Sequence, residues 1–284
     1  MYVKAKKALG QHFLKDNKIA ERIVKALVSP ETSPVTDPET AAVPATNQVL
    51  EIGPGTGVLT AFLVKEQGID FKLIEIDDES VRYLREYYPQ LGDSLIEGDF
   101  LRMDLEALFP GKFMIIGNFP YNISSQIFFK VLDYREKIPT VVGMLQKEVA
   151  QRLASPPGNK DYGILSVLLQ AWYNIEYLFT VDENSFIPPP KVKSAVIRIT
   201  ANDRKGLGCD EVLFKKVIKA TFNQRRKTIR NSIKSLLSTL DTTGKAYEDL
   251  CRARTPLLAK RPEQLSVEEF VELTLIVSSC ITLS

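Results

Sequence analysis

The pattern of hydrophobic and polar positions changes once along the chain. Up to about residue 200, short apolar runs bounded by Gly, Pro, Asp or Asn alternate with stretches in which apolar residues recur every three or four positions. The short runs indicate buried strands and the longer spacing indicates amphipathic helices, and this alternation predicts an α/β fold. The expected strands lie at 48–52, 71–77, 94–97, 113–116, 139–145, 173–181 and 192–200, and the expected helices at 17–28, 127–132, 146–156 and 164–172.

Beyond a polar, glycine-containing segment at 201–208, the pattern becomes wholly helical. Because exposed polar segments commonly separate domains, this change predicts a first domain at 1–203 and a small all-helical domain at 204–284. An earlier segment, 29–47, contains four prolines and no periodicity, and it is expected to be an exposed connector. The helices expected in the second domain lie at 212–220, at 225–240, near residue 247 and at 267–281.

Candidate ligand groups follow four successive strands. A glycine turn, Gly53-Pro54-Gly55-Thr56-Gly57, follows the first strand, and Glu75 lies near the end of the second. Asp99 comes directly after the third strand, and Asn118 after the fourth. An open parallel sheet binds its ligand at the carboxyl ends of its strands, so these groups are expected to converge on one crevice.

The chemistry of these groups points to S-adenosylmethionine. Glycines allow backbone to approach a ligand closely, and the following helix amino terminus favours a carboxylate. Glu75 can accept hydrogen bonds from both ribose hydroxyls, and Asp99 can accept one from an adenine amino group while Phe100 packs on the ring. The G-x-G-x-G spacing differs from the dinucleotide-binding G-x-G-x-x-G, and no phosphate-gripping lysine motif accompanies it.

The pentapeptide Gly117-Asn118-Phe119-Pro120-Tyr121 is predicted to be the place where a base amine is methylated. Pro120 biases Phe119 away from the helical region, so the Phe119 carbonyl and the Asn118 amide can be fixed side by side as two acceptors. An exocyclic adenine amine offers two N–H donors, and holding both aims its lone pair at an incoming methyl group. Tyr121 adds an aromatic face on which an extruded base can stack.

Composition narrows the class of protein further. The 284 residues are 44% hydrophobic and 25% charged, and no apolar run approaches the ~18 residues that span a bilayer. The three cysteines are far apart, and His12 is the only histidine, so neither a disulfide framework nor a metal centre is expected. Because the amino terminus does not resemble a signal peptide, we expect a cytoplasmic protein without a membrane partner. We also expect the protein to be a monomer.

Charge is distributed unevenly although the formal net charge is only +2. Residues 37–106 hold fifteen acidic and five basic residues, whereas 215–234 hold eight Lys or Arg and no acid. An acid-free cationic stretch favours contact with nucleic-acid phosphates over a merely solvated face. The helical domain is therefore expected to contact nucleic-acid phosphates, and, as a small domain beside one that transfers methyl groups, it is expected to select the substrate.

Several motifs carry a family resemblance that covers nearly the whole chain. The glycine turn, the Glu75 and Asp99 segments and Asn118-Phe119-Pro120-Tyr121 resemble the motifs of Rossmann-like class I methyltransferases, whose sheet has helices on both faces and which act on adenine N6 in RNA. Further motifs resemble those of the KsgA/RsmA family of small-subunit ribosomal RNA adenine dimethyltransferases. These are Gly10-Gln11-His12-Phe13-Leu14, Leu145-Gln146-Lys147-Glu148-Val149, Tyr162-Gly163-Ile164-Leu165-Ser166, Phe186-Ile187-Pro188-Pro189-Pro190-Lys191-Val192 and Phe222-Asn223-Gln224-Arg225-Arg226-Lys227-Thr228.

The resemblance assigns roles that spacing alone does not. It places the 186–190 segment at the border of the target-base pocket, and it reverses the reading of His12, which by residue type alone is a packed side chain. By resemblance, the cofactor site involves His12 and Leu14 mainly through backbone, Gly53 at the methionine part, Glu75 at the ribose, Asp99 at the adenine, and Asn118 at both cofactor and target amine.

The function implied is dimethylation of two adjacent adenosines near the 3′ end of 16S ribosomal RNA, with that RNA or a pre-30S particle as substrate and a role in small-subunit biogenesis. One alternative is a resistance-type enzyme that dimethylates large-subunit RNA, against which Arg225-Arg226-Lys227 and the triple proline argue. The other is a non-enzymatic assembly or transcription factor on the same fold, against which the intact pentapeptide argues.

Overall fold

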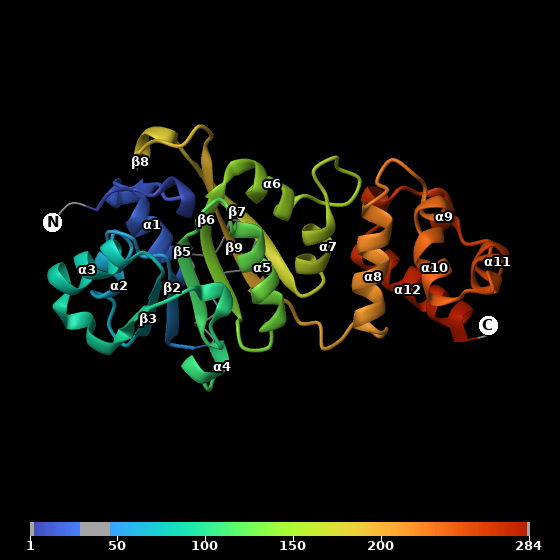
Figure 1. Cartoon of the computed structure of the whole chain (residues 1–284), viewed down its shortest axis with the longest axis horizontal. Coiled ribbons are helices and arrows are strands. Elements are labelled where there is room, and N and C mark those ends of the chain that lie inside the picture. The colour runs from blue at the N-terminus through green and yellow to red at the C-terminus, as the bar shows by residue number, and fades with distance from the viewer. Residues whose placement is uncertain (1–2, 29–45, 283–284) are drawn as a thin grey trace, which may run out of the picture. The chain divides into compact units, whose positions relative to one another are not determined.

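The structure is a computed structural model that describes residues 3–28 and 46–282, so the predicted connector lies, apart from its last two residues, outside the described residues. The chain forms two compact units (Figure 1). The first unit is Met1–Ala150 with Asn174–Ala201, and the second unit is Gln151–Tyr173 with Asn202–Ser284. The predicted division at 203/204 lies two residues beyond the end of the first unit, and 151–173 group with the C-terminal helices instead of with the first domain.

A seven-stranded mixed sheet forms the centre of the first unit, in the order β4-β3-β2-β5-β6-β9-β7. The five strands from β4 to β6 are parallel, and β9 runs antiparallel to β6. Each expected strand is present, and its ends differ from the expected ones by at most two residues. The bounds are β2 Gln48–Ile52, β3 Asp70–Glu75, β4 Leu95–Glu97, β5 Met114–Asn118, β6 Thr140–Gln146, β7 Tyr173–Val181 and β9 Ser194–Ala201.

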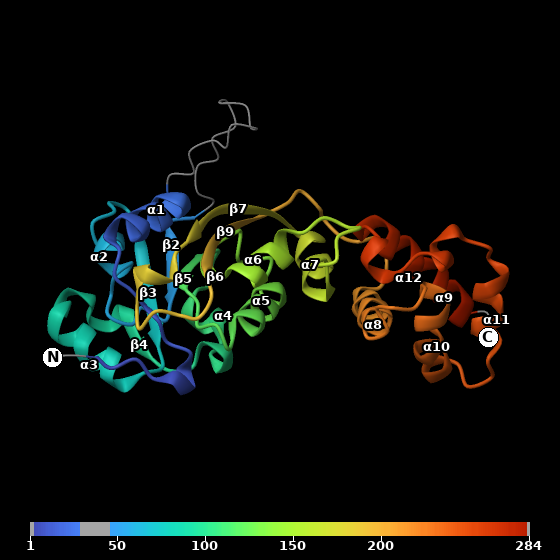
Figure 2. The ribbon, with the colours of Figure 1, turned by 90° about the horizontal axis from the view of Figure 1, so that it is seen from above.

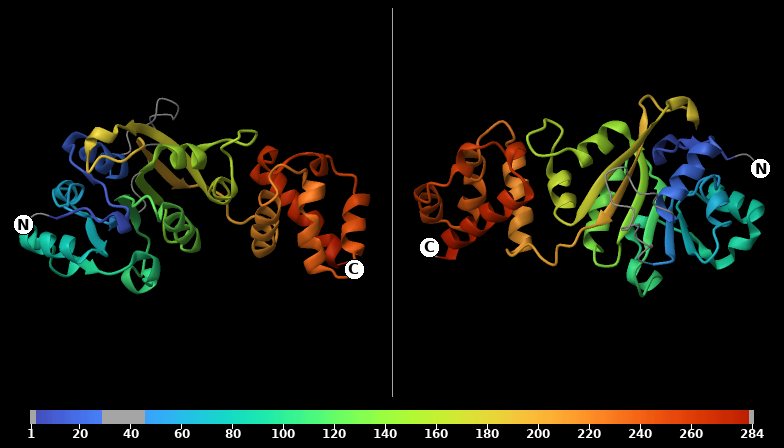
Figure 3. Two further views of the ribbon diagram at one scale, coloured as in Figure 1. Left: turned by 45° about the horizontal axis from the view of Figure 1, so that its top comes forward. Right: turned by 180° about the vertical axis from the view of Figure 1, so that it is seen from behind.

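Helices cover both faces of this sheet, as the sequence predicts (Figure 2). Helix α1, Asn17–Val28, lies on one face of the sheet and buries one apolar stripe against β5, β6 and β9. The right-hand view of Figure 3, from behind, shows this face. Helix α5, Ser124–Asp133, covers the opposite face and buries Ile127, Phe128 and Val131. The other helices of the first unit are α2 Thr60–Leu63, α3 Asp78–Tyr87, α4 Leu105–Leu108 and the start of α6 Lys147–Ala154.

A second, two-stranded sheet joins segments that lie far apart in the sequence. Strand β1, Phe13–Leu14, pairs antiparallel with β8, Phe186–Ile187 (Figure 1). The Lys15 amide extends this contact by donating to the Ser185 carbonyl at 2.9 Å. The amino-terminal arm is thereby fixed beside the proline-rich segment.

The second unit is helical. Its core contains a row of rings in which Tyr162 lies 6.3 Å from Phe222, and Phe222 lies 5.9 Å from Phe270. No helix in the described parts of the chain is long and apolar enough to cross a membrane. The helices are α7 Ile164–Gln170, α8 Glu211–Phe222, α9 Ile229–Ser232, α10 Lys234–Leu240, α11 Lys245–Arg252 and α12 Val267–Thr282.

The prediction of one helix over 225–240 is wrong. Residues 223–226 form a turn, and helix resumes only at Ile229, whose amide donates to the Lys260 carbonyl at 2.8 Å in place of an intrahelical partner. Arg225 donates to the Lys160 carbonyl and lies 3.7 Å from a Glu263 carboxylate oxygen. These tertiary contacts override the local pattern, and they use Arg225 inside the second unit.

Candidate active site

A crevice lies at the carboxyl ends of β2, β3, β4 and β5, where the sequence predicts it. Eight of the residues predicted from the sequence line this crevice. They are His12, Gly53, Glu75, Asp99, Asn118, Phe119, Pro120 and Tyr121. Leu14 does not line it. Its side chain is buried in the hydrophobic core, because successive side chains of a strand point to opposite sides and the neighbouring Phe13 faces the crevice. A role for Leu14 would therefore have to use its backbone.

The glycine turn brings bare backbone to the crevice. Gly53 has a φ of 63°, in the left-handed region that favours glycine, and a Cβ added there would meet only Pro120, at 3.9 Å. Gly55 also has positive φ, and a Cβ there would lie 2.8 Å from the Phe13 ring. The turn therefore leaves room for a ligand at Gly53 and for the amino-terminal arm at Gly55.

Glu75 is a buried carboxylate that is held in place by backbone amides. One oxygen accepts from the Gly55 amide and the other from the Asp77 amide, both at 2.9 Å. Burial raises the pKa of Glu75, while the hydrogen bonds from these amides lower it. Since a carboxylate has about four lone-pair sites, each oxygen keeps capacity to accept a ligand hydroxyl.

The turn that carries Asp99 is fixed by two contacts. Asp99 accepts from the Leu101 amide at 2.9 Å and so caps a short 3-10 turn, Phe100–Arg102. Lys130 of α5 donates to the Phe100 carbonyl at 2.6 Å and to the Met103 carbonyl. Burial lowers the pKa of Lys130, and its ammonium ties the Asp99 turn to α5, the helix that follows the pentapeptide at 117–121.

Asn118 has a defined orientation. Its Nδ2 donates to the His12 carbonyl at 2.8 Å. This bond assigns the amide so that Oδ1 is the remaining acceptor. The amino-terminal arm therefore orients the group predicted to bind the target amine.

Phe119 contributes to the site through its backbone. Its ring is 1% exposed and packs edge-on against Phe128, with centroids 5.9 Å apart. The ring occupies the space that a Cβ at Gly117 or Gly143 would need, at 2.8 Å and 2.3 Å respectively. Because the ring is buried, the carbonyl is the polar group that Phe119 can offer to a base.

Tyr121 and His12 form an aromatic wall. Their ring centroids lie 5.3 Å apart at 31°, and the Tyr121 hydroxyl hydrogen-bonds to Ser194 at the start of β9. Burial raises the pKa of Tyr121, and the Ser194 bond acts in the opposite direction. His12 Nδ1 lies 2.9 Å from the Pro188 carbonyl, so the proline-rich segment borders this wall.

Two contributors to the site escape sequence reasoning. Ile76 lines the crevice and is 52% exposed, which makes it an apolar surface beside Glu75 for a planar ring. The signal that could have been found is an apolar residue placed between two acids, Glu75 and Asp77, at the end of the predicted strand. Ser194 gives no signal, since nothing in the sequence relates a serine near a strand start to Tyr121.

The lining also limits the kind of ligand. Among the described residues that line the crevice there is no Lys or Arg, so no side chain offers a permanent cation to a phosphate. The described residues also contain no group of three or more His, Cys, Asp or Glu arranged to hold a metal ion. The crevice is built for a ligand with hydroxyl, amino and ring groups.

Together, the strand order, the antiparallel β9 and the crevice at the strand ends define a class I methyltransferase fold, and comparisons with known proteins agree. A dimethyladenosine transferase from Plasmodium falciparum has a similar structure, with a TM-score of 0.73 and 24% identity over 95% of this chain and 98% of that one. The 23S rRNA methyltransferase ErmE gives a TM-score of 0.60 and 25% identity, over 92% and 98% of the two chains.

Sequence comparison narrows the class to a family. The family model described as ribosomal RNA adenine dimethylase matches residues 2–270. The ribosomal RNA small subunit methyltransferase A of Parabacteroides distasonis is 60% identical over 274 residues, which cover 96% of this chain and 94% of the relative. The chain belongs to the ribosomal RNA adenine dimethylase family, which confirms the family inferred from its motifs.

Proposed function

We propose that this protein transfers methyl groups from S-adenosylmethionine to N6 of adenosines in small-subunit ribosomal RNA. The observation that carries the proposal is the Asn118 amide, whose Nδ2 is held by the His12 carbonyl so that Oδ1 is left to accept from the target amine. The 60% identity with a small-subunit methyltransferase supports the choice of RNA. By resemblance, the substrate is a pair of adjacent adenosines near the 3′ end of 16S RNA.

The crevice fits S-adenosylmethionine in three respects. Gly53 leaves open space that a Cβ would fill, which suits the methionine part. Glu75 retains acceptor capacity for ribose hydroxyls, and Asp99 and Ile76 offer an acceptor and an apolar face for adenine. The lack of a cation among the described lining residues argues against a phosphate-bearing cofactor.

When bound, the sulfonium of the cofactor supplies an activated methyl group. The residues of this chain then have to orient the adenine amine. The Asn118 Oδ1 and the Phe119 carbonyl accept hydrogen bonds from the two N–H groups of this amine, and these bonds localise its lone pair on nitrogen. Tyr121 stacks on the extruded base. The amine nitrogen forms the new N–C bond as the bond from that carbon to the cofactor sulfur breaks, so the sulfur leaves as a neutral thioether. The nitrogen afterwards releases one proton to water or to one of these carbonyls.

We also propose a division of labour between the two parts of the chain, in which the helical residues at 204–284 select the RNA. Arg226 and Lys227 are exposed in the turn after α8, and Lys215, Lys216 and Lys219 are exposed on α8 itself. Cations in such positions suit phosphate contacts, which position an RNA without reading its sequence. The protein acts in the cytoplasm as a monomer on the RNA or on a pre-30S particle.

The decisive experiment is mass spectrometry of ribosomal RNA from cells that lack this gene, with and without a plasmid that supplies the wild type or Asn118→Ala. We expect a pair of small-subunit dimethyladenosines to disappear and to return only with the wild type. Loss of a large-subunit dimethyladenosine would instead establish the resistance-type reaction. Unchanged methylation in both RNAs, with an assembly defect, would establish a non-enzymatic assembly role.

A further inference from the structure

The crevice has a wall that the sheet does not supply. Residues 6–13, the amino-terminal strap, contribute Leu9 through Phe13 to the lining. At one end the strap is fixed by β1, which pairs with β8. It is also tied to the pentapeptide side, because the Asn118 and Asn122 amides donate to the carbonyls of His12 and Ala8, at 2.8 and 3.3 Å.

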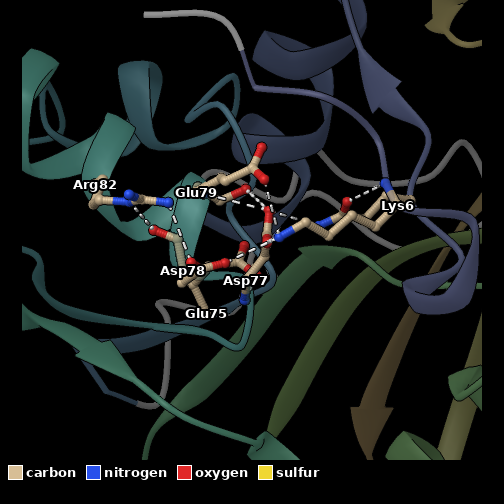
Figure 4. Close-up of polar contacts among 8 residues, drawn as sticks. Lys6, Glu75, Asp77, Asp78, Glu79 and Arg82 are labelled. Carbon is tan, nitrogen blue, oxygen red and sulfur yellow. Dashed lines mark hydrogen bonds and ion pairs between the residues drawn. The ribbon is translucent and has the colours of Figure 1, made fainter.

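The other end of the strap is fixed by Lys6. The Lys6 ammonium reaches the start of α3, where it pairs with Asp77, with Asp78 Oδ1 at 3.0 Å and with Glu79 Oε1 at 3.4 Å (Figure 4). The Asp77 side chain is 0% exposed, whereas that of Lys6 is 35% exposed. Gln11 links both partners, since its Oε1 accepts from the Lys6 amide and its Nε2 lies 3.4 Å from Asp77 Oδ2.

The acid that Lys6 pairs with is connected directly to the ribose-binding position. The Asp77 amide donates to Glu75 Oε1 at 2.9 Å, and the other Glu75 oxygen accepts from Gly55. Burial by itself would raise the pKa of Asp77, but hydrogen bonds from Lys6, Ser80 and Gln11 hold it below its usual value. The contact series Lys6, Asp77, Glu75, Gly55 therefore joins the strap to the glycine turn through the floor of the crevice.

We propose that Lys6 is a positioning residue that locks the strap over the nucleoside end of the crevice and thereby slows the release of bound S-adenosylmethionine. The inference rests on the proposed function, and it goes beyond that function by assigning a role to a residue that does not line the crevice. Without Lys6 the strap keeps its β1 anchor, but its first turn is no longer held against α3 by these ion pairs. Asp77 then also loses its cation beside a buried Glu75.

Ionic strength distinguishes this lock from ordinary packing. Two of the three acids around Lys6 are at least one-third exposed, so salt screens much of the attraction. Lys7, the next residue, is exposed and provides a matched control on the same strap. Because the Lys6 ammonium is already paired with acids at the start of α3, it is a poor ligand for a phosphate.

The test compares wild type with Lys6→Met, Lys6→Arg and Lys7→Met. Calorimetry and stopped-flow displacement give the dissociation constant and release rate of S-adenosylmethionine at low and high salt. We expect Lys6→Met to raise the dissociation constant and the release rate by about three- to tenfold at low salt, a size in keeping with an ion pair whose cation is partly exposed, and to flatten the salt dependence of both. Lys7→Met should behave as wild type, while Lys6→Arg should retain most of the affinity.

The KM for RNA separates a positioning role from a general structural one. The lock predicts a change in the KM for S-adenosylmethionine with an unchanged KM for RNA and an unchanged melting temperature of the second unit. Equal release rates and equal salt dependence in wild type and Lys6→Met would overturn the inference, as would an equal effect of Lys7→Met. If the wild type does not bind S-adenosylmethionine at all, the proposed function fails instead, so the two failures are distinguishable.

Discussion

The hydroxyl of Tyr121 hydrogen-bonds to the hydroxyl of Ser194, which lies 73 positions further along the chain and is fully buried at the start of β9. The ring that is proposed to stack on the target adenine is thus held at its far edge by the antiparallel strand of the sheet. From the sequence, loss of this hydroxyl is expected to be mild because the stacking ring survives. The structure changes that expectation.

Tyr121→Phe and Ser194→Ala are each expected to lower kcat/KM by about tenfold, because each leaves one buried hydroxyl without its partner and frees the ring. The double variant should be no worse than either single variant, since both remove the same bond. Steady-state methyl transfer with a double-mutant cycle measures this. Additive losses would show that the two hydroxyls act separately.

Asn118→Ala should lose turnover by about 10²- to 10³-fold with little change in RNA affinity, because its amide acts on the reacting nitrogen while the RNA is held elsewhere. Asn118→Asp should be nearly as inactive, since a carboxylate cannot donate to the His12 carbonyl. Single-turnover transfer and RNA binding are to be measured on the same preparations. Near-normal transfer by either variant would contradict the proposed mechanism.

Glu75→Ala should weaken S-adenosylmethionine binding by ~1.5 to 3 kcal/mol if the carboxylate holds both ribose hydroxyls. Glu75→Gln should be no milder, because its NH₂ group would face the amide of Gly55 or Asp77, which are also donors. Calorimetry gives the affinities and thermal unfolding serves as the control for folding. An unchanged affinity in a folded Glu75→Ala protein would remove the ribose role.

Glu51 gives a prediction for pH. It lies buried on β2, accepts from the Thr60 hydroxyl at 2.7 Å, and burial raises its pKa to about 8. Between the unfolded value of about 4.3 and 8, the folded carboxyl holds a proton that the unfolded one has lost, so folding stability falls as pH rises through this window and levels off above it. Relative to Glu51→Gln, the wild type should lose more than about 1 kcal/mol across this window in denaturant titrations. A pH-independent difference would show that Glu51 is ionised in the fold.

The basic turn after α8 makes a prediction for RNA binding. Replacing Arg226 and Lys227 with Gln should lower the slope of log affinity against log salt by roughly 0.7 to 0.9 for each phosphate that these side chains neutralise. Arg225→Gln is the control. Because Arg225 donates to the Lys160 carbonyl, its replacement should reduce the stability of the protein without changing that slope. Both variants are to be checked for S-adenosylmethionine binding. An unchanged slope in the Arg226 and Lys227 variant would mean that this turn is ordinary solvated surface.

How far the sequence predicts this molecule depends on the distance over which contacts act. Gly53, Glu75, Asp99 and Asn118 could be placed in one crevice because parallel strands end at one edge of a sheet, so local patterns suffice. The pairing of β1 with β8, the Lys6 lock and the Ser194 bond join residues more than 70 positions apart, and no local pattern encodes them.

The break in the helix predicted at 225–240 is also caused by contacts between residues that are distant in the sequence. The hydrophobic spacing of this segment predicts helix throughout, yet Arg225 donates to the Lys160 carbonyl and the Ile229 amide donates to the Lys260 carbonyl. Local propensity is a weak prior when tertiary partners compete for the backbone. Arg226 and Arg230, four positions apart, therefore do not lie on one helix, since Arg226 is in the turn and Arg230 is in α9.

The ring of Phe119 has a consequence for reading natural sequence variation in this protein. A change of Gly143 to Ala adds one methyl group in the middle of β6, and a variant-effect score based on residue similarity would rank it as harmless. Yet that methyl would lie 2.3 Å from the Phe119 ring, which is buried against Phe128, so the ring and its surroundings would have to shift. Such an allele should lower both the stability of the protein and the methylation of its RNA.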